Sequence, residues 1–442
     1  MNMAHTINPF HTLYLTEGVG TVDIPSLFSP VLVPHVAPLF LPGNVVLKGM
    51  QGTGKSMLLS LLDTRVRLQF WQQSEAAQPG ELLKSDPLPV DQRRFVGAGI
   101  NLSKSNAFKL RGIKLSNDPA ENNRLACQCF SDFVNCWVLR DLFDSLATLI
   151  SELSQHDARD RLDECGVSPD AKRLNRAVKL LANDAACSFL AGHDSTDDLQ
   201  RTVSSRVTAY KRLITNPRNK LPDEIEATRS ILGEPLSAAA TALRSAGVIE
   251  DDTNIIITLD QFETLERKAP YPGDDERILG FVRVIDELIG GRERAVSYRI
   301  GTRPNTQLSL SDASRDYATV DLDRILQRKE SGRGGRSNLF YRFSEDAFRR
   351  RISCSRFPQS EHIVNASAPL QYVFGKSPSV AGRGELSAPK RPVRALKLEK
   401  SWSADISEFL TNLAQRDVVS ARLGEAWVRQ HLARNEVVAP SD

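Results

Sequence analysis

The sequence predicts an α/β fold, with a parallel sheet flanked by helices, a helical insert and a mostly helical C-terminal region. Short β-branched runs alternate along the chain with segments whose apolar residues recur at three- and four-residue steps. Strands that alternate with helices form parallel sheets covered on both faces. The composition, 41% hydrophobic and 25% charged over 442 residues, excludes a fully disordered or fibrous chain.

Five runs are predicted as strands because they are short, apolar and bounded by turn residues: 44–48, 95–102, 254–259, 295–301 and 317–323. The clearest helix is predicted over 121–153, where Trp137 and the nearby cysteines follow the apolar stripe and are expected in the core. Shifts in composition divide the chain into five parts. These are an N-terminal arm packing on the core (1–43), the first part of the core (44–153), a helical insert (154–234), the second part of the core (235–353), and a linker with C-terminal helices (354–442).

Charge and cysteine content narrow the class of protein. There are 57 Lys and Arg against 54 Asp and Glu, so any nucleic-acid contact depends on a local patch, for which the basic segment 382–400 is a candidate beside the alternative of a solvated linker. Four prolines interrupt the apolar stretch 27–47, which excludes a lipid-exposed helix there. Six scattered cysteines without metal-ligand spacing, and an N-terminus without a secretory pattern, favour reduced thiols, no zinc site and a cytoplasmic protein.

The strongest motif is GMQGTGKS at residues 49–56, which fits the P-loop pattern G-x-x-x-x-G-K-[ST]. Its glycines allow backbone N–H groups to surround a phosphate, and the helix that follows directs its positive end at the same anion. Lys55 is placed to reach the β- and γ-phosphates, and the Ser56 hydroxyl to bind Mg²⁺. The predicted nucleotide-binding residues are Gly49, Gly52, Thr53, Gly54, Lys55, Ser56 and Met57.

A second motif is the buried run IIITLD, which ends at Asp260. Ligands of open parallel sheets bind beyond the carboxyl ends of the strands, so Asp260 is expected to meet the P-loop and to act with Ser56 on Mg²⁺. The next predicted strand ends at Thr302 and Arg303. Thr302 could hydrogen-bond the attacking water or the γ-phosphate and Arg303 could neutralise charge, although a strand that simply leaves into a turn explains these residues equally well.

Taken together, the NPF and LFSP of the arm, NVVLKGMQGTGKSMLLSLL, LDQFETLE and YRIGTRP resemble bacterial ATPases of the origin-recognition (ORC-like) branch of the AAA+ superfamily, and their STAND-type neighbours. The resemblance spans about residues 7–350. It implies an ASCE-type P-loop core that uses ATP and Mg²⁺ as a switch. It also implies Lys55 and Ser56 as the Walker-A pair, Asp260 as the Walker-B carboxylate and Thr302 at the sensor-1 position.

The chain departs from that pattern at the Walker-B end. A glutamate that polarises the attacking water usually follows the aspartate, but Gln261 stands here, and an amide cannot accept a proton. Either Glu263 takes the role, or the protein binds ATP and hydrolyses it slowly. Lys55 and Asp260 are 205 residues apart (260 − 55), which supports the helical insert, and neither a lid nor a winged helix is recognisable near the C-terminus.

We therefore expect an ATP-binding switch with Mg²⁺-dependent hydrolysis, its catalytic residues being Lys55, Asp260, Glu263, Thr302 and Arg303. The resemblance leaves the partner open between DNA and a second protein, in a mobile-element or phage-defence setting, and includes homo-oligomer formation. The alternatives are an interaction protein that binds ATP without hydrolysing it and a small-molecule phosphotransferase. For Arg349–Arg351, an arginine finger and a solvated helix face both remain open.

Overall fold

The computed structural model describes residues 24–75, 87–155, 159–266, 274–290, 295–304, 317–327, 329–330, 337–353, 360–367, 369–370, 402–416, 421, 424–425 and 428. The chain forms two compact units. One comprises residues 12–342 and the other residues 1–11 with 343–442. The basic segment 382–400 and the first 23 residues lie outside the described part of the chain.

A five-stranded parallel sheet is the centre of the larger unit. Its strands stand in the order β2-β3-β4-β1-β5, with bounds Phe95–Asn101, Asn254–Asp260, Val296–Thr302, Asn44–Lys48 and Tyr317–Asp321. All seven residues of β4 are buried, as are the first four of each of β1, β2 and β3, which explains their apolar, β-branched composition. The α/β fold predicted from the sequence is confirmed.

The register brings the carboxyl ends of the five strands to within one residue of the same level. Asn101 pairs with Asp260, Thr302 with Lys48, and Lys48 with Asp321. Since β4 separates β1 from β3, the P-loop that follows β1 and the aspartate that ends β3 meet across the end of β4.

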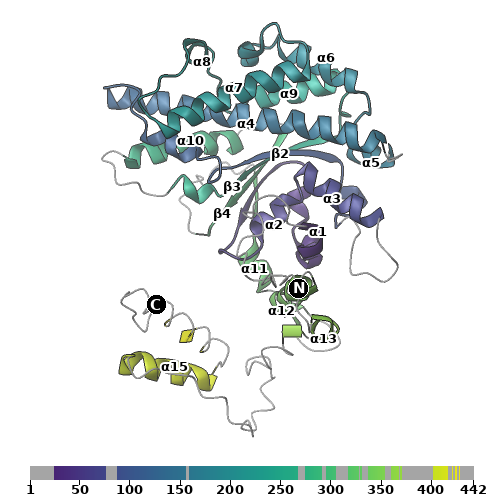
Figure 1. Ribbon diagram of the computed structural model, residues 1–442, viewed down its shortest axis with the longest axis vertical. Coiled ribbons are helices and arrows are strands. Elements are labelled where there is room, and N and C mark those ends of the chain that lie inside the picture. Colours follow the sequence, from purple (N-terminus) through teal and green to yellow (C-terminus); the bar gives the residue numbers. More distant parts are fainter. Residues whose placement is uncertain are drawn as a thin grey trace, which may run out of the picture. The chain divides into compact units, whose positions relative to one another are not determined.

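Helices cover the sheet on both sides (Figure 1). α2 (Lys55–Ser60) and α3 (Thr64–Glu75) lie on one side, and α4 (Pro119–Gln155) lies on the other with α10 (Asp274–Gly290) against it. The stacked rings of Phe130 and Phe281, whose centroids are 4.4 Å apart, join α4 to α10. The helix predicted over 121–153 corresponds to α4, which is longer by two residues at each end.

The residues before β1 are fastened to β4 by one buried guanidinium. Arg299 donates hydrogen bonds to the backbone carbonyls of Leu39, Leu41 and Gly43, and it is fully buried. This burial lowers the pKa of Arg299 to about 9. The short helices α1 (Ile24–Leu27), η1 (Pro30–His35) and η2 (Ala37–Phe40) precede this point, and Phe28 meets the Phe70 ring of α3 edge-on.

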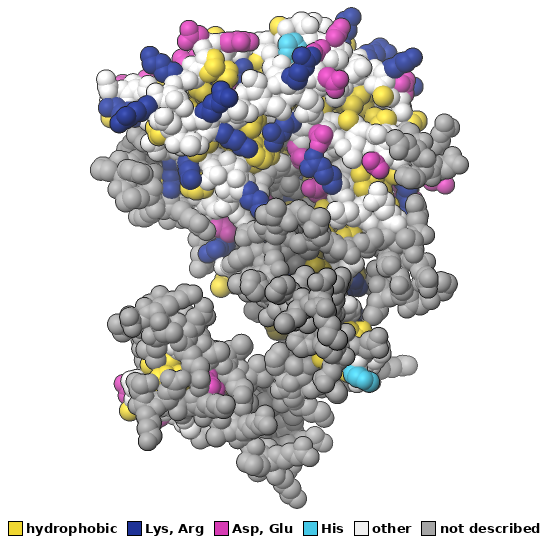
Figure 2. Space-filling model, viewed as in Figure 1, with side chains coloured by type: hydrophobic (Ala, Val, Ile, Leu, Met, Phe, Trp, Pro, Cys, Tyr) yellow, Lys and Arg dark blue, Asp and Glu magenta, His cyan; other side chains and the backbone are white. Residues whose placement is uncertain are grey.

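Between β2 and β3 most of the described residues are helical. After η4 (Ala107–Gly112) and α4 come α5 (Arg159–Cys165), α6 (Ala171–Leu181), η5 (Ala185–Leu190), α7 (Thr196–Thr215), α8 (Asp223–Ala227) and α9 (Glu234–Ser245). The face seen in Figure 2 carries Lys and Arg side chains interspersed with Asp and Glu over these helices. None of the helices described has both the length and the apolar character needed to cross a membrane.

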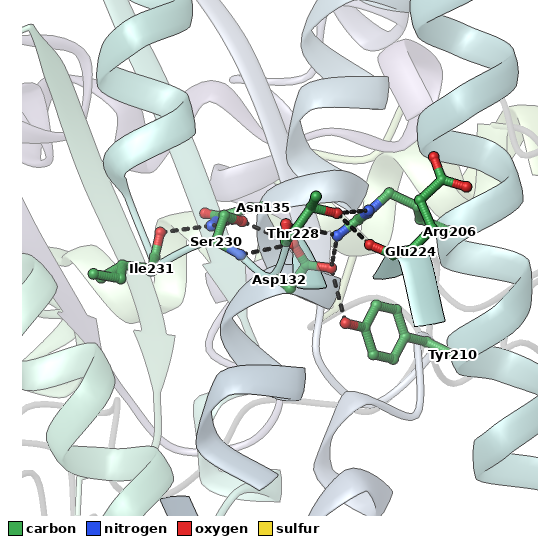
Figure 3. A network of polar contacts seen from close by, with 8 residues as sticks. All are labelled: Asp132, Asn135, Arg206, Tyr210, Glu224, Thr228, Ser230 and Ile231. Atoms are coloured by element: carbon green, nitrogen blue, oxygen red, sulfur yellow. Dashed lines mark hydrogen bonds and ion pairs between the residues drawn. The ribbon is translucent and has the colours of Figure 1, made fainter. Parts of the chain in front are cut away.

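One buried ion pair ties this helical region to α4 (Figure 3). Asp132 of α4 accepts hydrogen bonds of 2.8 Å from Arg206 and from Tyr210, both on α7. Its other carboxylate oxygen accepts from the backbone N–H and hydroxyl of Ser230, at 3.1 and 2.9 Å. Asn135, one turn along α4, accepts from Gly233 N–H at the start of α9. These contacts fix the loop between α8 and α9 to the helix that covers the sheet.

The cysteines of the described chain are structural. Cys129, Cys136, Cys165 and Cys187 are buried, Cys127 is partly buried, and all five are free thiols. Burial raises the pKa of Cys129 to about 11 and that of Cys187 to about 12, which keeps both thiols protonated.

The C-terminal unit contains most of α12 (Leu339–Ser353), together with α13 (Ser360–Val364) and α15 (Ala404–Arg416). Two arginines of the Arg349–Arg351 run make contacts within this unit. Arg350 pairs with Asp346 at 2.7 Å with 5% of its side chain exposed, and Arg349 donates to the Ala366 carbonyl. The interpretation of Arg350 as part of a solvated helix face is therefore wrong.

The Asp132–Arg206 pair generates a stability prediction. Replacing Asp132 with Asn leaves a buried guanidinium without its counter-ion, since only 5% of the Arg206 side chain and none of that of Asp132 is exposed. We expect Asp132→Asn to lower the free energy of unfolding by about 3 kcal/mol in urea denaturation. Glu121→Gln, which removes the solvent-exposed partner of Arg124, is the control and should leave the midpoint unchanged. Equal midpoints for the two variants would contradict a stabilising role for the buried pair.

Candidate functional site

The P-loop closes around the carbonyl of Met50. This oxygen accepts hydrogen bonds from the Thr53 hydroxyl and from Lys55 Nζ, each 2.8 Å long. Gly52 and Gly54 have φ of 89° and 93°, in the left-handed region that favours glycine, and Gly54 directly precedes α2. Met57 lies in the first turn of that helix. The loop thus has the backbone of a phosphate cradle, and its lysine is held over the turn.

Ser56 and Asp260 meet at the carboxyl ends of β1 and β3. Ser56 Oγ donates to Asp260 Oδ2 at 2.9 Å, although the two residues are 204 positions apart. Asp260 also accepts from the Gln261 N–H at 2.8 Å and, more weakly, from Asn101 Nδ2 at 3.4 Å. Burial raises the pKa of Asp260, whereas the Ser56 and Gln261 hydrogen bonds lower it. A hydroxyl beside a buried carboxylate is an oxygen donor set that suits Mg²⁺.

The described residues offer no cluster of three His, Cys, Asp or Glu side chains that could hold a metal. A magnesium ion at Ser56 and Asp260 would therefore complete its shell with nucleotide phosphates and water, as Mg²⁺ commonly does.

The turn after β3 brings Glu263 to the site. Gln261 adopts the left-handed conformation, with φ 60° and ψ 44°, and the short helix η6 (Phe262–Thr264) follows. Phe262 is fully buried, and the Thr264 hydroxyl closes the turn onto the Gln261 carbonyl at 2.8 Å. Gln261 thus ends the strand, and the tight turn presents the carboxylate two residues later.

Glu263 is paired with Arg303, and its charge raises the pKa of Lys55. Its Oε1 accepts from Arg303 Nε at 3.2 Å, and it is the carboxylate with the largest effect on Lys55. Partial burial lowers the pKa of Lys55, and the charges of Glu263, Asp260 and Asp323 oppose that shift. Glu263 Oε2 is buried and has no hydrogen-bond partner within the described chain. An unpaired buried carboxylate oxygen beside a phosphate cradle is suited to hold a water molecule or another donor.

Thr302 and Arg303 occupy the end of β4. Thr302 is fully buried and pairs in register with Lys48, the last residue before the P-loop. Arg303 leaves the strand, keeps 46% of its side chain exposed, and lies 3.5 Å from Gln51 Oε1 of the loop. The structure therefore brings all the residues predicted for the site to one edge of the sheet.

Two polar neighbours of the site were not predicted. Asn101 ends β2 beside Asp260, and both carboxylate oxygens of Asp323 accept from the Met50 N–H, at 3.0 and 3.2 Å. Asp323 is the second residue of α11 (Leu322–Leu326), which directly follows β5. Asn101 is the second-last residue of the strand predicted over 95–102, and Asp323 is the last residue of the strand predicted over 317–323. The rule that ligands collect at the carboxyl ends of strands could therefore have found both.

A family model described as ORC-CDC6-like matches residues 16–436. The chain belongs to the ORC-CDC6-like family. This membership confirms the resemblance drawn from the motifs and indicates an AAA+ ATPase, in a family that usually binds nucleotide. No curated protein and no solved structure matches the chain.

The contact between β4 and Asp260 is tight enough to test. A Cβ at Gly301 would lie 2.6 Å from Asp260 Oδ1 and 2.7 Å from Leu59 Cδ1. Because Ser56 and the Gln261 N–H hold Asp260, it can move aside only by losing hydrogen bonds. We expect Gly301→Ala to lower the free energy of unfolding by about 1–3 kcal/mol, measured in urea.

Gly112→Ala is the matched control, because its Cβ would meet nothing within 4 Å. Its effect should stay within about 0.5 kcal/mol. The close approach of β4 to Asp260 would be refuted by a Gly301→Ala protein that is as stable as the control.

Proposed function

We propose that this protein is an ATP-binding molecular switch that hydrolyses ATP slowly with Mg²⁺. The observation that carries the proposal is the 2.9 Å hydrogen bond between Ser56 and Asp260 beside a glycine-rich loop that holds Lys55. In this arrangement the loop amides and Lys55 bind the phosphates, and Ser56 and Asp260 hold the metal. The metal would neutralise charge that develops on the phosphates.

The proposal assigns the attacking water to Glu263. Gln261 cannot accept a proton, whereas Glu263 has a buried oxygen without a partner among the described residues. Thr302 and Arg303 stand at the end of the strand next to the P-loop strand, where they are suited to contact the γ-phosphate or the attacking water. ATP binding would then favour one conformation, through which the protein acts on DNA or a partner protein or assembles with itself, and hydrolysis would reset it.

A second candidate function is an interaction protein that holds ATP without turning it over. It is favoured by Gln261 at the position next to Asp260 and by the ion pair that engages one oxygen of Glu263. The two functions share nucleotide binding and differ only in hydrolysis. A small-molecule phosphotransferase has no such support.

Nucleotide binding is tested by Lys55→Ala. Removing the ammonium group that the proposal assigns to the phosphates should weaken MgATP binding by about ten- to one-hundredfold, from the usual strength of hydrogen bonds to charged groups. Titration calorimetry on the full chain measures this, with the exposed Lys109→Ala as control. If neither wild type nor control binds ATP, the proposed function is wrong.

Hydrolysis is tested on the same proteins by phosphate release. We expect slow turnover in wild type that Glu263→Ala abolishes and Gln261→Ala retains, because only the former removes a proton acceptor. Nucleotide binding without turnover in wild type would favour the second candidate function. Turnover that survives in Glu263→Ala would remove Glu263 from the mechanism.

A further inference from the structure

Two cations lie over the ring of one tryptophan in the helical region. Trp137 of α4 is partly buried against the core, and the centroid of its ring lies 4.6 Å from Arg140 Cζ and 4.6 Å from Lys211 Nζ. Arg140 is on the next turn of α4, whereas Lys211 belongs to α7. Because both cations are equally close to one centroid, the two positive charges lie within twice that distance of each other.

These two cations have no counter-ion within the described part of the chain. Arg140 and Lys211 take part in no ion pair there, and Asp144, one turn along α4 from Arg140, is paired with Arg65 instead. Burial lowers the pKa of the Lys211 ammonium, and the charge of Arg140 lowers it further. Like charges held close together repel each other, so an anion from outside the chain that contacts both cations would offset that repulsion.

The helices that carry the two cations are fixed against each other. Trp137 packs against the ring of Phe133, with the two centroids 5.7 Å apart. Gln200 of α7 donates to the backbone carbonyl of Arg140 at 2.9 Å, and the Asp132 contacts of Figure 3 join the same two helices farther along. A ligand therefore meets cations whose supports are already in position, which lowers the entropic cost of binding.

The surroundings favour an acidic peptide over a nucleic acid. A nucleic-acid backbone brings a phosphate with every nucleotide and therefore suits an extended basic surface. Asp141 and Asp144 instead follow Arg140 on α4, and the face in Figure 2 mixes Lys and Arg with Asp and Glu. The two cations also occupy the space over the Trp137 ring that a stacked base would need. A short segment with two carboxylates requires only Arg140 and Lys211.

We propose that Trp137, Arg140 and Lys211 form a docking site for an acidic segment of a partner protein. Two carboxylates of the segment pair with the guanidinium and the ammonium, and an adjoining apolar side chain packs against the exposed part of the Trp137 ring. The site uses no residue of the P-loop edge of the sheet, so the inference goes beyond the proposed ATP switch and does not depend on it.

Fluorescence anisotropy with the full chain tests this site. The probe is a labelled peptide of Glu-Glu-Leu repeats, and a Gln-Gln-Leu peptide is its neutral counterpart. Arg140→Gln and Lys211→Gln should each weaken binding of the acidic peptide about fivefold, the upper range of a partly exposed ion pair. The double variant should bind it about twentyfold more weakly than wild type, and wild type should discriminate against the neutral peptide by a similar factor. Higher ionic strength should reduce all of these differences.

Two further variants serve as controls. Lys179→Gln removes an exposed cation of α6 and should bind the acidic peptide like wild type. Lys55→Ala should also bind it like wild type, so that failure of the proposed ATP site and failure of the docking site can be told apart. Urea denaturation shows whether each variant is folded.

Three results would overturn the docking site. One is wild type that binds the acidic peptide no more tightly than the neutral peptide. Another is binding that survives in the double variant, since the contact would then lie elsewhere on the chain. The third is an oligo(dT) strand that binds more tightly than the peptide and loses affinity in Arg140→Gln and Lys211→Gln, which would assign these residues to nucleic acid.

Discussion

The rest of the site depends on the hydrogen bond between Ser56 and Asp260, and this bond requires the ends of two separated strands to be aligned. The two residues follow or end strands that are not neighbours, because β4 lies between β1 and β3. They meet because the parallel register brings the strand ends to the same level and because Gly301 of β4 has no side chain to collide with Asp260. A one-residue shift in either pairing would turn the side chains of a strand to its other face.

Buried polar contacts fasten the elements around the sheet. Arg299 is fully buried in β4 and donates to the carbonyls of the segment that enters β1, so that the two adjacent strands share one anchor. In the helical region, Asp132 joins α4 to α7 and to the loop before α9. Buried charges are costly unless they are fully hydrogen-bonded. How much each contact stabilises the fold therefore depends on how many polar atoms of the buried charge are hydrogen-bonded.

Much of the fold could be predicted because its signals are local. NVVLK before a glycine loop specified β1 to the residue, and the apolar stripe over 121–153 located α4 within two residues. The position of Glu263 could not be predicted, because it depends on the left-handed backbone of Gln261, a conformation uncommon outside glycine. The contacts of Arg303 with Glu263 and of Asp323 with Met50 join residues 40 and 273 positions apart, and no local pattern encodes such pairs.

The most direct test of the account is the magnesium dependence of ATP binding in Asp260→Asn. Titration calorimetry with and without Mg²⁺ isolates the contribution of the Ser56–Asp260 pair, because loop amides and Lys55 bind phosphate in either condition. The account predicts that Mg²⁺ raises the affinity of the wild type for ATP about tenfold and leaves the affinity of Asp260→Asn for ATP almost unchanged. An equal gain from Mg²⁺ in both proteins would contradict it, because the metal would then be held without Asp260.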